Sequence, residues 1–298
     1  MKAVDYHAYC HPLDVETLEN LKQIPGFTPL LKGFMKIYSE RTMQLLNMSN
    51  KIRLGPEQLP DIYSLLPPIC EVLGIDEPEF YLELNPAPNA YTTGDTTIAV
   101  TITSGLLDYM TNDEIKAVIA HECGHIACHH VLYHTMAQFI LNGGAAILKL
   151  GTLITYPLQL ALLHWVRCSE FSADRAAAIY MRQSEPIVTT MMRLAGGGKT
   201  LAEQVNRDLY LKQAVDFKEL ADKNLWNKIL QLLALMENDH PFLSVRASEI
   251  DKWCTDKRYL DIIAHINDEN TEETSCPNCG AKIEENWVFC KRCGWKLQ

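Results

Sequence analysis

The sequence predicts a mostly helical α+β fold that contains one small β-sheet. Apolar residues recur at helical spacing over most of the first 75 residues and again after residue 112. The alternation that is typical of strands is confined to two short stretches, residues 78–84 and 97–103. With 298 residues, of which 47% are hydrophobic and 21% charged, the chain can bury a full core and has the composition of an ordinary globular protein.

A helical region comes first, over residues 1–75. Apolar residues at helical spacing precede a Pro25-Gly26 break, and a longer amphipathic run follows over residues 29–48. We therefore expect several N-terminal helices.

Two strands and a capped helix follow. Residues 97–103 alternate Ile or Val with Ala or Thr, and Pro and Gly residues mark turns between this strand and the one before it. Thr111 and Glu114 have the spacing of a capping box, which predicts a helix that begins at Asn112 and runs through Ile126.

An apolar segment, residues 136–165, carries a single formal charge at Lys149. Gly143-Gly144, Gly151 and Pro157 interrupt it, which favours two short helices over one long one. A membrane helix needs about 20 predominantly apolar residues, and a central lysine costs roughly 2.5–3.5 kcal/mol. A buried or surface-lying hairpin is therefore favoured over insertion into a membrane.

Helical spacing continues to the end of the predicted core. We expect helices over residues 169–192, 198–236 and 242–266. The acidic, polar composition of residues 267–275 is that of a linker.

Charge and cysteine usage exclude some classes of protein. The formal net charge of -10 argues against binding to nucleic acid, which normally requires a basic face. The first 40 residues contain no apolar run of the kind found in secretory signals, so we expect a chain that is not secreted. Ten cysteines without such a signal fit a reducing, cytoplasmic location, with membrane association left open.

A metal-binding motif falls inside the capped helix. His121-Glu122-Cys123-Gly124-His125 has the form H-E-x-x-H, and residues four apart on a helix project from one face about 5–6 Å apart. Both imidazoles can then bind one zinc ion, and a catalytic zinc needs a third protein ligand so that water can fill the fourth position. Glu122 is placed to take a proton from that water and to pass it to the leaving amine.

The third ligand is predicted on a second helix. Glu170 and Asp174 lie four residues apart, so one helix face offers both a zinc ligand and a carboxylate that can accept the other N–H of a ligating histidine. We assign these roles to Glu170 and Asp174, respectively.

These motifs, taken together and in order, resemble the gluzincin peptidase family that contains the CaaX prenyl endopeptidase and the bacterial membrane protease HtpX. The likeness runs from about residue 78 to residue 246. It rests on these segments: Asn89-Ala90-Tyr91, Gly105-Leu106-Leu107, Val118 to His125, Glu170 with Asp174, and His240-Pro241 with Arg246.

The resemblance implies that His121, His125 and Glu170 hold zinc and that Glu122 is the catalytic base. It also implies that His240 lies near the oxygen that becomes negatively charged during peptide hydrolysis, where an imidazole donor would stabilise that charge.

The resemblance further implies a binding edge for an extended polypeptide. In this family an edge strand precedes the zinc helix, so we expect residues 97–103 to be that strand, with Asn89 and Ala99 as substrate-binding residues. Relatives similar to HtpX have hydrophobic spans before the zinc helix, whereas the N-terminal region here is polar. Residues 136–165 lie where such relatives place spans, which leaves a peripheral membrane contact open.

A second metal site is predicted near the C-terminus. Cys276, Cys279, Cys290 and Cys293 form two C-x2-C pairs separated by ten residues, which is the spacing of a zinc ribbon. Four thiolates leave no open position, so this zinc should be structural.

The predicted organisation is an N-terminal helical region (1–75), a zincin-type metallopeptidase domain (76–266), a linker (267–275) and a zinc ribbon (276–298). The favoured reaction is hydrolysis of peptide bonds within proteins or peptides, with one catalytic and one structural zinc. One alternative is a non-catalytic, zinc-stabilised chaperone or adaptor that binds extended chains, although such a protein has no chemical use for Glu122. The other is a peptidase that acts on membrane-embedded or lipid-modified substrates, which residues 136–165 would have to support.

Overall fold

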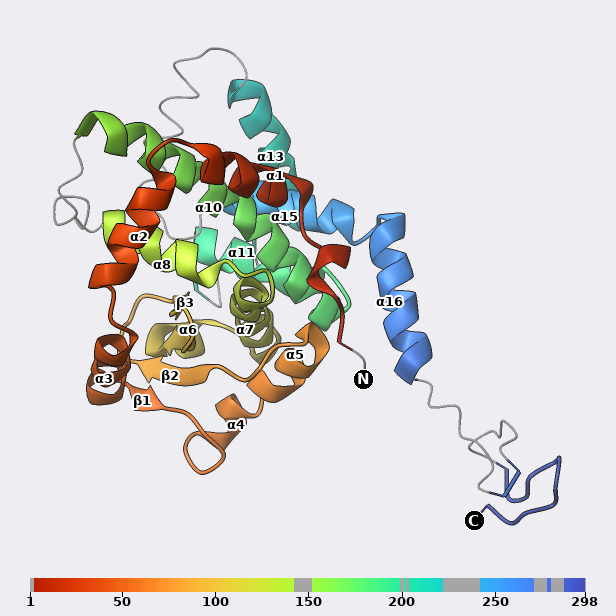
Figure 1. The fold of residues 1–298 in the computed structure, drawn as a ribbon. Helices are drawn as coiled ribbons and strands as arrows, with labels where there is room; N and C mark the ends of the chain where they lie inside the picture. The colour runs from red at the N-terminus through yellow and green to blue at the C-terminus, as the bar shows by residue number, and fades with distance from the viewer. Residues whose placement is uncertain are drawn as a thin grey trace.

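A small four-stranded sheet lies among the helices of this protein (Figure 1). The computed structural model describes residues 3–141, 152–198, 201, 204–221, 242–270, 278–279 and 287–297. The strands are β1 (Ile52–Arg53), β2 (Glu79–Glu83), β3 (Ala90–Thr93) and β4 (Ala99–Thr103), in the spatial order β1-β2-β4-β3. The predicted α+β class with a small sheet is confirmed.

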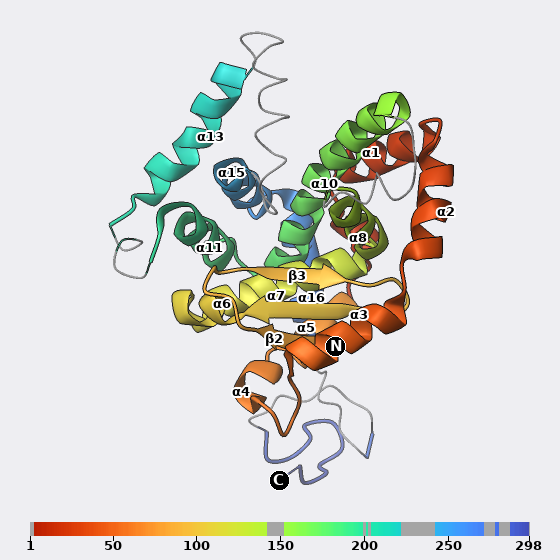
Figure 2. The same ribbon diagram turned by 90° about the vertical axis from the view of Figure 1, so that its left-hand side faces the viewer.

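The edge of the sheet differs from the prediction. β4 pairs with β2 in parallel and with β3 in antiparallel, so it is an inner strand, and the strand at the edge is β3. All five residues of β4 are buried, and its threonines are not a solvent face: Thr101 accepts a hydrogen bond from Lys51, and Thr103 donates to Ala87 and Asn89. The prediction that residues 97–103 form the edge was therefore wrong. Two strands, β3 and β4, precede the helix that carries the H-E-x-x-H motif, and their order along the chain does not show that β3 is the outer one (Figure 2).

The N-terminal region is helical as predicted. It contains η1 (Tyr6–Ala8), α1 (Pro12–Gln23), α2 (Phe27–Ile37), α3 (Glu40–Asn50), α4 (Pro60–Tyr63) and α5 (Leu66–Leu73). Gly26, which caps α2, has a φ of 97°, so the Pro25-Gly26 break needs the backbone freedom of glycine.

The apolar segment is covered by these N-terminal helices. It includes α8 (Val131–Phe139) and the first half of α10 (Thr152–Met181), and both pack against α1 and α2 in one apolar cluster. Its buried members are Leu21, Phe27, Leu30, Phe34, Met136, Ala137, Ile140, Leu158, Leu162 and Trp165. The predicted burial of this hairpin is confirmed for its described residues, while Gly143, Gly144, Lys149 and Gly151 lie outside them.

The predicted interruption at Pro157 was wrong, because α10 runs through it. Pro157 is the sixth residue of α10, beyond its first turn, so the helix continues past it with the loss of one backbone hydrogen bond, to the carbonyl of Leu153. Among the described residues, no helix has both the length and the apolar character required to cross a bilayer.

The remaining helices are α6 (Ser104–Tyr109), α7 (Asn112–Ala127), α11 (Glu185–Gly196), α13 (Arg207–Ala221), α15 (Leu243–Trp253) and α16 (Lys257–Asn270). The capping box of Thr111 and Glu114 is present at the start of α7, as predicted. Four boundaries differ among the described residues. Helix α10 ends at Met181 before α11, and α13 begins at Arg207 after the non-helical residues 204–206 and not at residue 198. A turn separates α15 from α16, and α16 continues four residues into the predicted linker. Residues 271–275 of that linker lie outside the described part of the chain.

Candidate metal centre and active site

Helices α7 and α10 meet at an unusually close approach. A Cβ atom added to Gly124 of α7 would lie 2.7 Å from the Cβ of Ala176 and 3.0 Å from the Cα of Ala173, both in α10. Such separations are too short for any residue but glycine at this position. The glycine between the two motif histidines therefore allows α10 to bring Glu170 to the face of α7 that carries them.

His121, His125 and Glu170 place three donor atoms around one point. The two Nε2 atoms are 3.2 Å apart, His121 Nε2 lies 3.5 Å from Glu170 Oε2, and His125 Nε2 lies 3.3 Å from Glu170 Oε1. A tetrahedral zinc with bonds of 2.0–2.1 Å separates its ligand atoms by about 3.3 Å. The two imidazole nitrogens and the Glu170 carboxylate thus lie at separations that one zinc ion can bridge, although the two nitrogens face different oxygens of Glu170. All three residues are buried.

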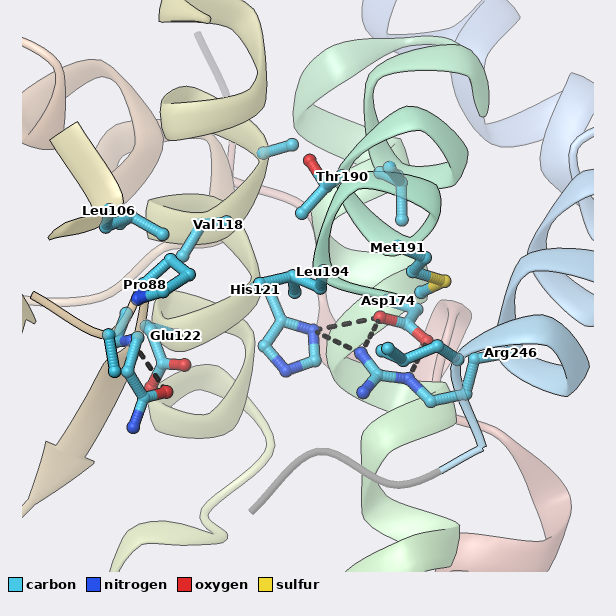
Figure 3. Close-up of a pocket in the computed structure, with 16 residues that line it drawn as sticks. Pro88, Leu106, Val118, His121, Glu122, Asp174, Thr190, Met191, Leu194 and Arg246 are labelled. Carbon is cyan, nitrogen blue, oxygen red and sulfur yellow. Dashed lines mark hydrogen bonds and ion pairs between the residues drawn. The ribbon is translucent and has the colours of Figure 1, made fainter. Parts of the chain in front are cut away.

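Asp174 supports His121 from behind. The Nδ1 of His121 is 2.9 Å from Asp174 Oδ1, as the dashed lines of Figure 3 show. Burial opposes a charge on His121, but its hydrogen bonds to Asp174 and Glu170 outweigh that effect and raise its pKa to about 9. The same carboxylates that hold a proton here would favour a metal cation at Nε2.

Arg246 of α15 neutralises both acidic residues. Its guanidinium lies 2.7 Å from Glu170 Oε2 and donates to Asp174 at 2.6 and 2.8 Å, and all three side chains are buried. Burial tends to raise the pKa of Asp174, but the charge and hydrogen bonds of Arg246 hold it below its ordinary value. Asp174 is therefore held as an anion before any metal binds, and the same guanidinium places a positive charge beside Glu170.

Glu122 faces the edge strand. The hydroxyl of Thr92 in β3 donates to Glu122 Oε2 at 2.7 Å, which orients the carboxylate beside the three donor atoms. Glu122 is buried, and with His121 it lines the pocket drawn in Figure 3. A carboxylate in this pocket is a candidate for the group that takes a proton from a water molecule at the metal.

Two hollows lie along β3, one on each side of the donor atoms. The first, of about 290 Å³, is mainly apolar and is lined by Pro88, Leu106, Val118, Ile187, Met191 and Leu194 together with His121 and Glu122 (Figure 3). The second, of about 310 Å³, is more polar and is lined by Tyr91, Thr92, His125, Val131, His134, Thr135 and Gln138. Asn89, a predicted substrate-binding residue, borders both hollows. Its role in substrate binding stays a prediction.

One predicted site residue lies away from this centre, and another lies outside the described residues. Ala99 is in the inner strand β4, where β2 and β3 pair on either side, so it cannot offer an edge to substrate. The assignment of Ala99 to substrate binding was wrong for the same reason as the edge-strand prediction. His240 lies outside the described residues, and its role stays a prediction.

The C-terminal cysteines also gather. The sulfur atoms of Cys279, Cys290 and Cys293 lie within 4.8 Å of one another, and those of Cys279 and Cys290 are 3.7 Å apart. A tetrahedral zinc with Zn–S bonds of about 2.3 Å separates its sulfur ligands by about 3.8 Å. Cys276, the fourth predicted ligand, lies outside the described residues.

Two residues of this centre, Thr92 and Arg246, were not predicted to have a role in it. Arg246 was visible as part of the family motif, but its partners are 72 and 76 residues away and could not be inferred from spacing. Thr92 belongs to the short strand β3, whose four residues carry no periodic signal of their own.

His121, His125 and Glu170 form a buried cluster that could hold a metal ion, on two packed helices, with Glu122 next in sequence to His121. This arrangement fits a zinc metallopeptidase. The sequence pattern of Peptidase family M48 matches residues 59–254, and that of a zinc-ribbon domain matches residues 275–297. The chain therefore belongs to peptidase family M48 and is a zinc metalloendopeptidase.

Its relatives agree with this assignment. The plastoglobule-localized metallopeptidase 48, chloroplastic, of Arabidopsis thaliana is 32% identical over 274 residues, which is 91% of this chain and 79% of that protein. The protease HtpX homolog of Moorella thermoacetica is 24% identical over 248 residues, covering 74% of this chain and 80% of the relative. The protease HtpX homolog 2 of Methanosarcina mazei is 24% identical over 196 residues, covering 57% and 66%, respectively. No solved structure matches the chain.

Proposed function

We propose that this metallopeptidase uses His121, His125 and Glu170 as ligands of a catalytic zinc and Glu122 as its general base. The observation that carries the proposal is the set of distances among the predicted ligands. The Nε2 atoms of His121 and His125 are 3.2 Å apart, and oxygen atoms of Glu170 lie 3.3 Å from His125 Nε2 and 3.5 Å from His121 Nε2. Family membership lends no support to the alternative of a non-catalytic adaptor.

Peptide hydrolysis at this site would combine the chemistry of zinc with the roles of Glu122, Thr92 and Asp174. Zinc, when bound, makes water more acidic and polarises the peptide carbonyl. Glu122 accepts the proton of the attacking water and returns it to the departing amine, while the Thr92 hydroxyl holds the carboxylate in position. Asp174 accepts a hydrogen bond from the Nδ1–H of His121 and so keeps Nε2 available as a ligand.

We propose that substrates are extended polypeptides that add to the outer edge of β3, which pairs with β4 alone among the described strands. This edge passes the donor atoms and lies between the two hollows, so a bound chain would place side chains in both. The apolar lining of the first hollow favours a large apolar residue next to the cleaved bond. The charged side chains of Glu122, Asp174 and Arg246 also line this hollow, so the preference concerns the part formed by Leu106, Met191 and Leu194.

The C-terminal cysteines form the second zinc site of the proposal. Four thiolates saturate a zinc ion, so this site would hold the tail together and take no part in hydrolysis. Two zinc ions per chain follow, one at each site.

Apolar side chains exposed on α2, α3 and β1 are the feature that bears on membrane contact. Residues 27–53 contain five cations and one anion, Glu40, in a chain whose formal net charge is -10. Lys51 and Arg53 pair with Glu83 and Glu79, so the exposed positive charge comes from Lys32, Lys36 and Arg41. Glu40 is engaged with backbone amides of residues 95–97, and the exposed apolar side chains of this surface are Met35, Ile37, Met43, Leu45, Leu46, Met48 and Ile52. We propose that this basic, apolar surface makes a peripheral contact with anionic lipid, in place of residues 136–165.

Vesicle flotation tests the lipid contact. We expect binding to vesicles that contain anionic phospholipid, weaker binding at high salt, and loss of binding in Leu45→Ser/Leu46→Ser. Leu209→Ser, which removes an exposed leucine of α13, should leave flotation unchanged. Equal flotation with purely zwitterionic vesicles, or no flotation at all, would exclude the proposal.

Metal content and casein hydrolysis together test the catalytic assignment. Wild type should hold about two zinc ions and cleave casein, and Glu122→Gln should keep both ions and be inactive. Cys290→Ser should lose only the structural ion. A protein that carries only the ion lost in Cys290→Ser, and that never cleaves, would refute the proposal.

A further inference from the structure

His130 lies directly behind the zinc ligand His125. After α7 the backbone turns sharply at His129, whose φ is +59°, and the amide of His130 donates to the carbonyl of His125 at 2.9 Å. The turn brings the two rings together, with His130 Nδ1 3.0 Å from His125 Nδ1. Both side chains are buried.

Asp14 of α1 completes a chain of contacts that starts at this ligand. Its Oδ2 lies 2.9 Å from His130 Nε2 and accepts a 2.6 Å hydrogen bond from Ser172, and its Oδ1 accepts the indole N–H of Trp165 at 2.9 Å. Asp14 is only 2% exposed, and it lies in the first turn of α1, where the helix dipole favours an anion. A buried aspartate with three donors around it is stable as a carboxylate.

The arrangement determines where the protons lie. An ionised Asp14 can only accept, so the facing Nε2 of His130 carries a proton and a neutral His130 has its lone pair on Nδ1. The Nδ1 of His125 must then be the donor in the contact between the two rings. The lone pair of His125 is consequently on Nε2, the atom that points to the metal position.

We propose that Asp14 and His130 are positioning residues for the catalytic zinc: they hold His125 in its metal-binding tautomer and orientation. The two ligating histidines thus have different supports. His121 donates directly to Asp174, whereas His125 reaches its carboxylate through His130. The second support comes from α1, which lies outside residues 59–254, the part of the chain that matches the family pattern.

Zinc affinity distinguishes this role from a structural one. We would measure competition with a chelator in the full chain, with the ribbon zinc identified by Cys290→Ser. His130→Leu and Asp14→Ala should each weaken binding of the other zinc by about 10–100-fold, the effect expected when the outer partner of a ligating histidine is lost. His130→Gln should recover most of the affinity, because its amide can accept from His125 and donate to Asp14.

Trp165→Phe is the matched control. It removes a hydrogen bond to the same carboxylate and should lower the melting temperature, but it leaves the chain from His125 to Asp14 intact. We expect zinc affinity within about twofold of wild type. Unchanged affinity in His130→Leu, or an equal loss in Trp165→Phe, would overturn the proposal.

The inference rests on His125 being a zinc ligand, so the two claims need separate tests. His125→Ala should abolish the catalytic zinc; if it does not, the ligand assignment of the proposed function fails. If His125→Ala loses the ion while His130→Leu retains full affinity, only the positioning role fails. Both readouts are independent of any peptidase activity.

Discussion

Replacing Arg246 with methionine should destabilise the protein far more without zinc than with it. The guanidinium lies 2.6–2.8 Å from oxygen atoms of Glu170 and Asp174, and none of the three side chains is more than 6% exposed. Removal of one partner of a buried ion pair costs about 3–5 kcal/mol, because the other charge stays buried. Without metal, Arg246→Met leaves two such carboxylates side by side, so we expect a loss at the upper end of this range.

With zinc bound, Glu170 regains a cation and only Asp174 lacks one. We therefore expect the loss in free energy of unfolding to fall by about 2 kcal/mol when zinc is saturating. By thermodynamic linkage the same difference appears as tighter zinc binding to the variant, by about 30-fold.

Arg193→Met is the control for this comparison. Arg193 pairs with Glu114 at 2.9 and 3.0 Å, both side chains are buried, and neither contacts the metal centre. The loss in free energy of unfolding caused by Arg193→Met should be the same with and without zinc. Zinc bound at the ribbon stabilises wild type and variant equally, so it does not change this comparison.

Urea unfolding in a chelator and in excess zinc, for wild type and both variants, measures these quantities. Equal losses for Arg246→Met in the two conditions would refute the reasoning, since they would mean that Arg246 is not the cation that holds Glu170. Weaker zinc binding by this variant would refute it as well.

Three further predictions follow from single contacts. Gly124→Ala would place a methyl group 2.7 Å from Ala176; forcing α7 and α10 apart should cost about 1–3 kcal/mol and weaken zinc binding, and unchanged affinity in chelator competition would contradict this. Thr92→Val keeps the shape of the side chain but removes the donor to Glu122, so kcat should fall about tenfold with zinc content unchanged, while Thr92→Ser should stay active. Although burial opposes it, the partners of Asp14 hold its pKa below the ordinary value of about 3.9, so its contribution to stability is present above that pH and is lost as pH falls through the folded-state pKa. In a chelator, the stability difference between wild type and Asp14→Asn should accordingly shrink below about pH 4.

Much of the metal centre could be predicted from sequence because its parts are local. His121, Glu122 and His125 lie within one helix, whose start is encoded by a capping box, and helical spacing alone puts both histidines on one face. Glu170 could be predicted as a ligand by the same argument on a second helix. The close approach of these helices depends on small residues that carry no pattern.

The parts that could not be predicted depend on contacts between distant segments. The edge strand β3 has four residues between turns, too few for alternation to be recognised, and its identity follows only from pairing with β4. Asp14 is one of several acidic residues in a polar helix and lies 116 residues from His130. Nothing in the sequence distinguishes it from a solvated carboxylate.

The two halves of α10 connect the N-terminal region to catalysis. Its first half buries Leu158 and Leu162 under α1 and α2, and its second half carries Glu170. Between them, Trp165 packs in the apolar cluster and also donates to Asp14, so one residue of α10 joins the apolar cover to the polar chain behind His125. A change that detaches α1 would therefore expose the apolar hairpin and, by our proposal, release a zinc ligand at once. For this reason we expect the N-terminal helices to be required for metal binding as well as for folding, although they begin before the part of the chain that matches the family.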